Sequence, residues 1–384
     1  MIPKDWDVVV LGKYSEISRG GSPRPIQDYL TSSCRGINWI KIGDVSKSSK
    51  YIFSAAEKII PEGVSKSRTV FCGDLILSNS MSFGRPYILK IDGCIHDGWL
   101  VIQNYQSAFD KEYLYYCLGS EFTIQQYISM AAGSSVQNLN KDKVSAVIIA
   151  KPPIQEQVAI AEALSDVDSL ISSLQKLIEK KKAIKRGAMR ELLTGKKRLP
   201  GFSGEWSNLR IEEIANLHDN LRVPVEKSMR EKGNIPYYGA NGIQDYVNGY
   251  THNGSYVLIA EDGANDLQEY PIRYASGKMW VNNHVHVLDG KNSVSDTRFL
   301  SYSMSTIDYQ AAITGGTRAK LNGHILMQLA LDLPLLAEQQ AIAQVLSDMD
   351  SEIEQLKKKL SKYQQIKQGM MQELFTGRIR ITNY

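Results

Sequence analysis

Few residues of this 384-residue sequence have the types and spacing that enzyme catalysis requires. The string Lys151-Pro152-Pro153-Ile154 comes nearest to the Pro-Pro loop with which adenine methyltransferases hold a flipped base. It lacks both the polar residue that would bind the amine and the aromatic residue that would stack on the base. The sequence also has no Gly-x-x-x-x-Gly-Lys-Ser/Thr phosphate loop, which excludes a P-loop ATP motor. We therefore expect no catalytic residue and no bound cofactor in this chain.

Candidate metal ligands are equally sparse. His284 and His286 would place two imidazoles on one face of a strand, as a metal site could. No cysteine or third histidine is close in sequence, and the neighbouring Asn282 and Asn283 favour an ordinary polar strand end. The cysteines, spaced for neither a zinc motif nor a disulfide framework, are Cys34, Cys72, Cys94 and Cys117. We predict no metal site, reduced thiols and a cytoplasmic location.

The composition, with 43% hydrophobic and 22% charged residues, is that of a globular protein. The N-terminus does not resemble a signal peptide, and no apolar run approaches the roughly 20 residues that cross a bilayer. We therefore expect no membrane association. A net charge of +4 permits nucleic-acid binding without arguing for it, so the function must be inferred from the organisation of the chain.

The strongest feature of the sequence is an internal repeat. Residues 152–199 align with residues 334–381 at a constant shift of 182 without a gap, and 24 of the 48 positions are identical. The landmarks include Glu156-Gln157 against Glu338-Gln339, and Thr194-Gly195 against Thr376-Gly377. Such a match indicates a duplicated segment.

Each copy has the pattern of one long helix, about 40 residues and therefore roughly 60 Å in length. Prolines stand at both starts, and Gly195 and Gly377 follow the last expected turns. Apolar residues alternate steps of four and three, which is the seam of a coiled coil. The seam comprises Ile160, Leu164, Val167, Ile171, Leu174 and Ile178 in one copy, and Ile342, Leu346, Met349, Ile353, Leu356, Leu360 and Tyr363 in the other. Gly187 and Gly369 occupy equivalent places within the two helices, and we expect close helix approach there.

The segments before the two helices are more weakly related. Leu139-Asn140 aligns with Leu321-Asn322 at the shift of 182, whereas Trp6 aligns with Trp206 at a shift of 200. Short β-rich runs between turn residues predict two small α/β domains of one ancestry. We predict a first domain at 1–151, a first spacer helix at 152–195, a join at 196–205, a second domain at 206–333, a second spacer helix at 334–377, and a tail at 378–384.

The tail repeats the join, because residues 376–380 match residues 194–198, which lead into a domain. The end of the chain should therefore return toward the first domain, which makes the two helices antiparallel. The predicted fold class is α+β: two small α/β domains separated by two long antiparallel coiled-coil helices in a pseudo-two-fold, cyclic arrangement. A two-fold object with a rigid spacer suits a DNA target built as two half-sites at fixed separation, and dissimilar domains predict dissimilar half-sites.

The loops of both domains carry the residue types that contact base edges and phosphates. In the first domain we predict DNA contacts at Arg19, Arg24, Asn38, Arg85 and Gln137. In the second domain we predict them at Arg222, Tyr238, Asn241, Arg318 and Lys320. Ordinary surface polarity is the alternative for each. The ten Lys and Arg residues between Lys176 and Arg198 leave open a contact to phosphates, a solvated helix face and a face turned to an acidic partner, and we slightly favour the last two.

Several segments resemble the specificity subunits of type I restriction-modification systems. The segment Ile17-Ser18-Arg19-Gly20-Gly21-Ser22-Pro23 is similar to the loop that opens their target-recognition domains, and Ile37-Asn38-Trp39-Ile40 with Gly43-Asp44 to the segment that follows. Leu192-Leu193-Thr194-Gly195, and Leu199-Pro200-Gly201-Phe202 with Glu205-Trp206, resemble the family's central join. The resemblance covers nearly the whole chain, but the opening loop is absent from the second domain at residues 217–223.

This resemblance implies a DNA-recognition subunit that is not itself an enzyme. Each target-recognition domain would read one half of a bipartite, asymmetric site on double-stranded DNA. The helices would set the spacing and dock two modification subunits, which bind S-adenosylmethionine and methylate adenine, and ATP- and Mg-dependent restriction subunits would join through them. The residues alone leave three alternatives open: a stand-alone coiled-coil adaptor, a DNA-binding regulator without restriction partners, and a lone methyltransferase or nuclease.

Overall fold

The computed structural model describes residues 2–46, 49–79, 83–131, 138–267, 269–313 and 320–381. The chain divides into two compact units, of which the first is Met1–Gln175 with Lys359–Tyr384 and the second is Lys176–Lys358. Each unit contains an α/β domain and parts of two long helices, α5 (Ile154–Leu192) and α9 (Leu336–Phe375). Gly195 and Gly377, which follow these helices, both have a φ of +66°, the left-handed conformation that favours glycine at a helix end.

In the described residues of the first unit, the strands form two five-stranded sheets and one two-stranded sheet. One five-stranded sheet has the order β2-β11-β8-β9-β5: β2 (Glu16–Arg19), β11 (Trp99–Gln103), β8 (Leu75–Ser78), β9 (Pro86–Leu89) and β5 (Tyr51–Ile52). The other has the order β3-β6-β4-β10-β7: β3 (Leu30–Thr31), β6 (Glu57–Ile59), β4 (Ile37–Ile40), β10 (Gly93–Ile95) and β7 (Arg68–Val70). The short sheet pairs β1 (Asp7–Val10) with β12 (Ile148–Lys151) in antiparallel register. The helices of this domain are α1 (Pro61–Val64), α2 (Lys111–Leu118), α3 (Glu121–Ala131) and α4 (Lys141–Ser145).

Alternation along the central strands explains why they are buried on both faces. Leu75 and Leu77 of β8 belong to the core that also contains the helices, whereas Ile76 belongs to the core shared with the second sheet. Since successive side chains of a strand point to opposite faces, this sheet lies between two hydrophobic layers. Every residue of β8 and β9 is accordingly buried.

The described part of the second unit has a six-stranded sheet and a two-stranded sheet. The larger sheet has the order β14-β19-β17-β18-β15-β16: β14 (Ala215–Leu217), β19 (Val285–Gly290), β17 (His252–Ala260), β18 (Ile272–Val281), β15 (Lys232–Gly239) and β16 (Gly242–Val247). The short sheet pairs β13 (Ser207–Arg210) with β20 (Ala330–Leu333), as β1 pairs with β12 in the first unit. The helices of this domain are α6 (Ile211–Ile214), α7 (Thr297–Met304) and α8 (Gly323–Gln328).

The two long helices are antiparallel. In the first unit, Leu164 near the start of α5 and Phe375 at the end of α9 share one core. In the second unit the order reverses, because Leu192 at the end of α5 shares a core with Leu346 near the start of α9. The predicted fold class of two α/β domains with two long antiparallel helices is therefore confirmed.

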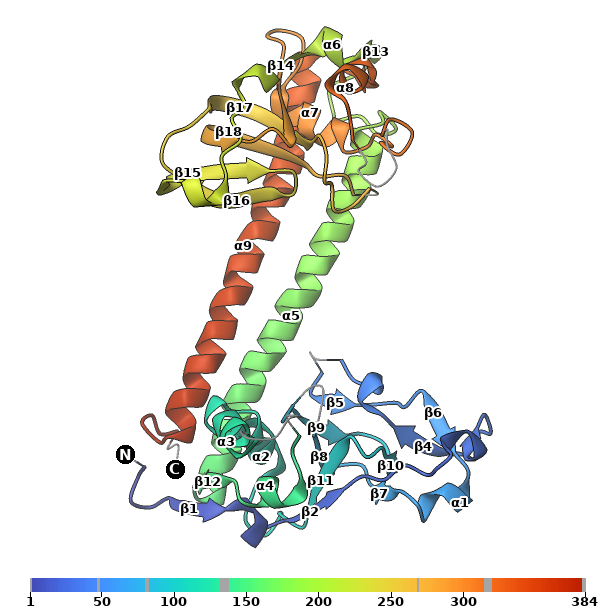
Figure 1. The fold of residues 1–384 in the computed structure, drawn as a ribbon, viewed down its shortest axis with the longest axis vertical. Coiled ribbons are helices and arrows are strands. Elements are labelled where there is room, and N and C mark those ends of the chain that lie inside the picture. Colours follow the sequence, from blue (N-terminus) through green and yellow to red (C-terminus); the bar gives the residue numbers. More distant parts are fainter. Residues whose placement is uncertain are drawn as a thin grey trace. The chain divides into compact units, whose positions relative to one another are not determined.

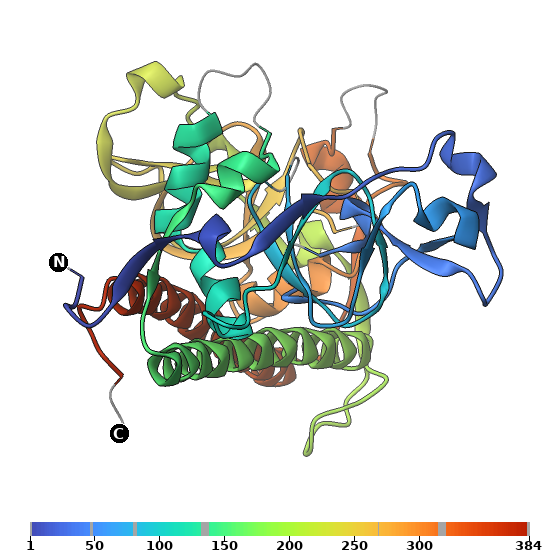
Figure 2. The same ribbon diagram turned by 90° about the horizontal axis from the view of Figure 1, so that it is seen from below.

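The tail of the chain returns to the first domain. Gly377 lies against Pro3, and the Arg380 guanidinium contacts the carboxylates of Asp5, at 2.7 Å, and Glu156, at 2.5 Å. Figure 2 shows β1 beside the end of α9. In the second unit Arg198 of the join binds Glu338 in the same way, at 2.5 Å. The tail and the join thus make matching ion pairs, each within its own unit.

The expectation of close helix approach at the two helical glycines is wrong. A Cβ atom added at Gly187 or Gly369 would meet no atom within 4 Å. These glycines therefore leave open space beside the helices instead of admitting a neighbouring backbone.

Candidate functional site

The predicted contacts in the first domain are partly brought together around Asp97. Arg19 is exposed at the end of β2, and its Nε donates to the Asp97 carbonyl at 3.0 Å. The Arg24 side chain is 83% exposed and lies 3.7 Å from the Asp97 carboxylate, which also accepts a hydrogen bond from Ser22 at 3.0 Å. Arg19 and Arg24 thus form a basic surface at the opening loop of the domain, and Ser22 adds a hydroxyl group to it.

The other predicted residues of the first domain lie elsewhere. The half-buried Asn38 donates from Nδ2 to the Asp92 carbonyl at 2.8 Å, so part of its hydrogen-bonding capacity is used within the protein. The Arg85 guanidinium lies 5.7 Å from the centre of the Tyr87 ring and lines a different cleft. Gln137 lies outside the described residues.

In the second domain, Arg222 and Lys320 belong to a network of ion pairs. The Arg222 guanidinium contacts Asp219 at 3.2 Å and Glu261 at 2.5 Å, and its side chain is only 15% exposed. Lys320 reaches the other oxygen of Glu261 at 2.8 Å. Burial raises the pKa of Glu261, but hydrogen bonds from Lys320 and Arg222 outweigh it, so the pKa is lowered overall.

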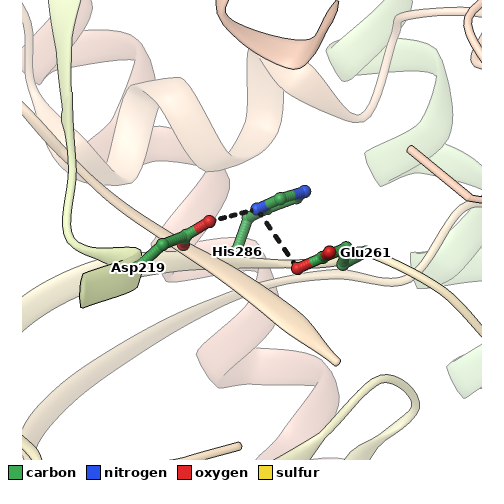
Figure 3. Close-up of side chains that lie close together, drawn as sticks. All are labelled: Asp219, Glu261 and His286. Carbon is green, nitrogen blue, oxygen red and sulfur yellow. Dashed lines mark hydrogen bonds and ion pairs between the residues drawn. The ribbon is translucent and has the colours of Figure 1, made fainter. Parts of the chain in front are cut away.

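The same network contains His286, which was considered at the sequence level only as a partner of His284. Its Nε2 lies 2.8 Å from the Leu321 carbonyl, and its Nδ1 lies 2.6 Å from Asp219 and 3.8 Å from Glu261 (Figure 3). A carbonyl and a carboxylate both accept hydrogen bonds, so both ring nitrogens of His286 lie beside acceptors. His284 pairs separately with Asp262, at 2.6 Å.

Asp219, Glu261 and His286 lie close enough together to hold a metal ion. All four carboxylate oxygens are, however, already engaged, because Asp219 also accepts from the Val287 amide at 3.1 Å. A metal ion would have to displace Arg222, Lys320 and the hydrogen bond between His286 and Asp219. The donor set therefore fits an ion-pair network that ties the turn after β14, the end of β17, β19 and the segment before α8.

Tyr238 and Asn241 lie at the hairpin between β15 and β16. Tyr238 is half-buried, and burial raises the pKa of its hydroxyl while nearby Arg273 lowers it. Asn241 is exposed, donates to the Gly263 carbonyl at 2.9 Å and accepts from the Asn265 amide at 3.0 Å. Arg318 lies outside the described residues.

The seam residues of the long helices fall into two groups. The buried ones are Ile160, Leu164, Leu174, Ile178, Ile342, Leu346 and Ile353. The half-buried ones are Val167, Ile171, Met349, Leu356, Leu360 and Tyr363. Within the basic segment of α5, Lys181 and Lys185 pair with Glu352 and Asp350 of α9, at 2.6 Å and 2.5 Å. Part of that positive charge is therefore neutralised between the helices.

The ion-pair network of the second domain could not be found from the sequence. Glu261 is 42 positions from Asp219, counted on the sequence, and no local spacing links the two. By contrast, the repeat of Glu156-Gln157 as Glu338-Gln339 did indicate equivalent positions in the two units. Gln157 and Gln339 are both 1% exposed and occupy equivalent places at the starts of α5 and α9.

Comparison with known proteins gives a consistent result. The model of the family described as "Type I restriction modification DNA specificity domain" matches twice, at residues 3–186 and 203–367. The putative type I restriction enzyme specificity subunit S.HindORF215P of Haemophilus influenzae is 47% identical over 150 residues, which are 39% of this chain and 38% of that protein. The type I restriction enzyme MjaVIII specificity subunit of Methanocaldococcus jannaschii is 23% identical over 430 residues, covering 100% of this chain and 95% of that protein.

Solved structures share the fold. The S subunit of a type I restriction-modification system from M. genitalium matches with a TM-score of 0.65 at 16% identity, covering 97% of this chain and 96% of that one. The HsdS subunit of Thermoanaerobacter tengcongensis matches with a TM-score of 0.51 at 17% identity, covering 98% of both chains. Among the helices in the described part of the chain, none is long and apolar enough to cross a membrane.

Proposed function

The chain belongs to the type I restriction-modification DNA specificity family, and on this premise we propose that its two domains read the two halves of one split DNA site. As a specificity subunit it recognises DNA target sites, and its family is non-catalytic.

This proposal rests on one contrast. The contacts at the starts of α5 and α9 are the same in the two units, whereas the sheets of the two domains differ. Gln157 and Gln339 make the same three hydrogen bonds in the two units, and Arg380–Glu156 repeats as Arg198–Glu338. As far as the structure describes them, the first domain has two five-stranded sheets, whereas the main sheet of the second has six strands. Two dissimilar domains that are joined to the long helices by equivalent contacts favour an asymmetric DNA target with a spacer of constant length.

Within the domains, we propose that the residues predicted from the sequence contact DNA directly, apart from Arg222. In the first domain they are Arg19, Arg24 and Arg85, with Asn38 in a supporting place and Gln137 retained from the sequence. In the second they are Tyr238, Asn241 and Lys320, with Arg318 retained from the sequence. Arg222 is proposed to act indirectly, because its guanidinium is engaged by two carboxylates.

The long helices are proposed to fix the separation of the half-sites and to dock two modification subunits. Restriction subunits would join through these, and S-adenosylmethionine, ATP and Mg²⁺ would be bound by the partner subunits. Exposed apolar side chains on α5, such as Leu170, Leu177 and Ile184, support a docking role. The assembly would act where the chromosome is, in the cytoplasm.

The test is the methylation pattern of the host chromosome. Sequencing that detects N6-methyladenine should find a split motif with two different halves, and deletion of this gene should abolish methylation at that motif alone. An Arg24→Ala chain should weaken recognition of one half only. A continuous motif, or methylation that survives the deletion, would refute the proposal.

A further inference from the structure

Two clefts occupy equivalent positions in the two units. In the second unit a cleft of about 640 Å³ is lined by Lys185 and Met189 of α5 and Tyr302 of α7. In the first unit a cleft of about 440 Å³ is lined by Lys367 and Met371 of α9 and Tyr116 of α2. The lysines and methionines match at the repeat shift of 182. The duplication has therefore preserved a cleft where each domain meets a long helix.

In each cleft, the lysine from the long helix is paired with an aspartate. Lys185 contacts Asp350 at 2.5 Å, and the Tyr302 hydroxyl donates to the same carboxylate at 2.6 Å. In the first unit, Lys367 contacts Asp168 at 2.6 Å, and the Tyr116 hydroxyl donates to it at 2.8 Å. The lysine charges are thus balanced inside the protein.

The arginines that line the clefts, in contrast to the lysines, contact neutral groups. Arg298 donates to the Ser347 hydroxyl at 2.7 Å and lies 4.5 Å from the centre of the Tyr274 ring. Arg273 donates to the Asn241 carbonyl at 3.1 Å. Among the described residues, neither arginine forms an ion pair with a carboxylate, and the same holds for Arg85 in the first cleft. This contrasts with Arg198, whose guanidinium binds a buried carboxylate.

The charge and chemistry of the linings indicate the ligand. Among the described residues, the charged side chains lining the second cleft are Lys185, Arg273, Arg298 and Asp350, that is three cations against one carboxylate. Ser305, directly after α7, and Ser351 of α9 add hydroxyl groups to the lining. Guanidinium groups with hydroxyls are the usual partners of phosphate oxygens, and a guanidinium held on an aromatic ring is already oriented for binding.

We propose that these two clefts bind backbone phosphates of the DNA flanking each half-site, through Arg273 and Arg298 in the second unit and Arg85 in the first. This inference rests on the proposed function. It assigns these arginines to sequence-independent affinity, whereas the loop residues around Asp97 and the β15–β16 hairpin would carry sequence preference. The long helices then contribute to DNA binding through the clefts they line.

The experiment measures the salt dependence of binding by the full-length chain. Two duplexes are used, one with the split motif found by methylation sequencing and one of scrambled sequence. Each lost phosphate contact should reduce the slope of log K against log salt by about 1. Arg298→Gln should therefore reduce the slope by about 1 on both duplexes, the Arg273→Gln/Arg298→Gln pair by about 2, and Arg85→Gln by about 1.

Two variants serve as controls. Arg298→Lys keeps the charge and should keep the slope. Arg210→Gln removes one positive charge outside the clefts, where the guanidinium already contacts Gln328 at 2.9 Å, and should leave the slope unchanged.

The inference is overturned if the glutamine variants keep the wild-type slope, or if they lose binding to the motif duplex alone. It is also overturned if DNA binding is unchanged and co-purification with a methyltransferase is lost, because the clefts would then bind protein. If instead the proposed function is wrong, the wild-type chain will bind the motif duplex no more tightly than the scrambled duplex.

Discussion

The buried glutamines at the starts of α5 and α9 give a sharp test of how the domains are joined to the helices. The Gln157 amide accepts a hydrogen bond from the Asp110 backbone at 2.8 Å and donates to the carbonyls of Ala108, at 3.0 Å, and Pro152, at 2.9 Å. Gln339 repeats all three contacts with Asp296, Val294 and Pro334, at 2.9, 3.0 and 2.8 Å.

The perturbation is Gln157→Met or Gln339→Met, which preserves volume and removes the polar amide. Each change leaves one backbone N–H and two carbonyls without their partner. An unsatisfied buried group costs about 1–3 kcal/mol, and since two of the three contacts are only partly buried we expect a loss of about 2–4 kcal/mol in each unit. Because the contacts are the same, the two losses should agree within about 1 kcal/mol.

The assay is urea unfolding of the full chain followed by tryptophan fluorescence. Trp6, Trp39 and Trp99 report on the first unit, and Trp206 and Trp280 on the second. Gln155→Met and Gln340→Met are matched controls, because both residues are exposed on the same helices, and they should change stability by less than about 0.5 kcal/mol. Losses below about 1 kcal/mol, or a loss in only one unit, would refute the claim that equivalent glutamines fasten equivalent junctions.

Two further predictions concern the helices and the ion-pair network. Gly187→Ala and Gly369→Ala should each stabilise the chain by about 0.5–1 kcal/mol, because the added methyl meets open space and glycine is costly within a helix; unchanged or lower unfolding midpoints would contradict this. The pKa of Glu261 is lowered on folding, so its contribution to stability is full above its ordinary value of 4.5 and is lost as the pH falls through the lower folded value. Urea unfolding between pH 3 and 6 should therefore show a weaker acid dependence for Glu261→Gln than for wild type, and parallel curves would count against the network.

The repeat made the helical part of the fold predictable. A constant shift of 182 without gaps gave two equivalent helices, and the match of residues 376–380 to 194–198 gave their direction. Such features are predictable from local sequence, because the proline at the start of a helix, the glycine after its end and the seven-residue apolar pattern all lie within one segment.

The domains were less predictable because their key contacts join distant residues. Arg222 looked like a free loop arginine, yet Asp219 and Glu261 engage it. The helical glycines suggested close packing, yet packing depends on which face each helix turns to its neighbours. Arg273 and Arg298 gave no local signal, since only the fold brings β18 and α7 to one cleft.

The central claim is that each domain reads one half of the target. It is tested most directly by replacing the second domain with another copy of the first and sequencing the methylated adenines made by the assembled complex. The account predicts a palindromic split motif in which the first half-site occurs twice in inverted order. A methylated motif that keeps the original second half would contradict it.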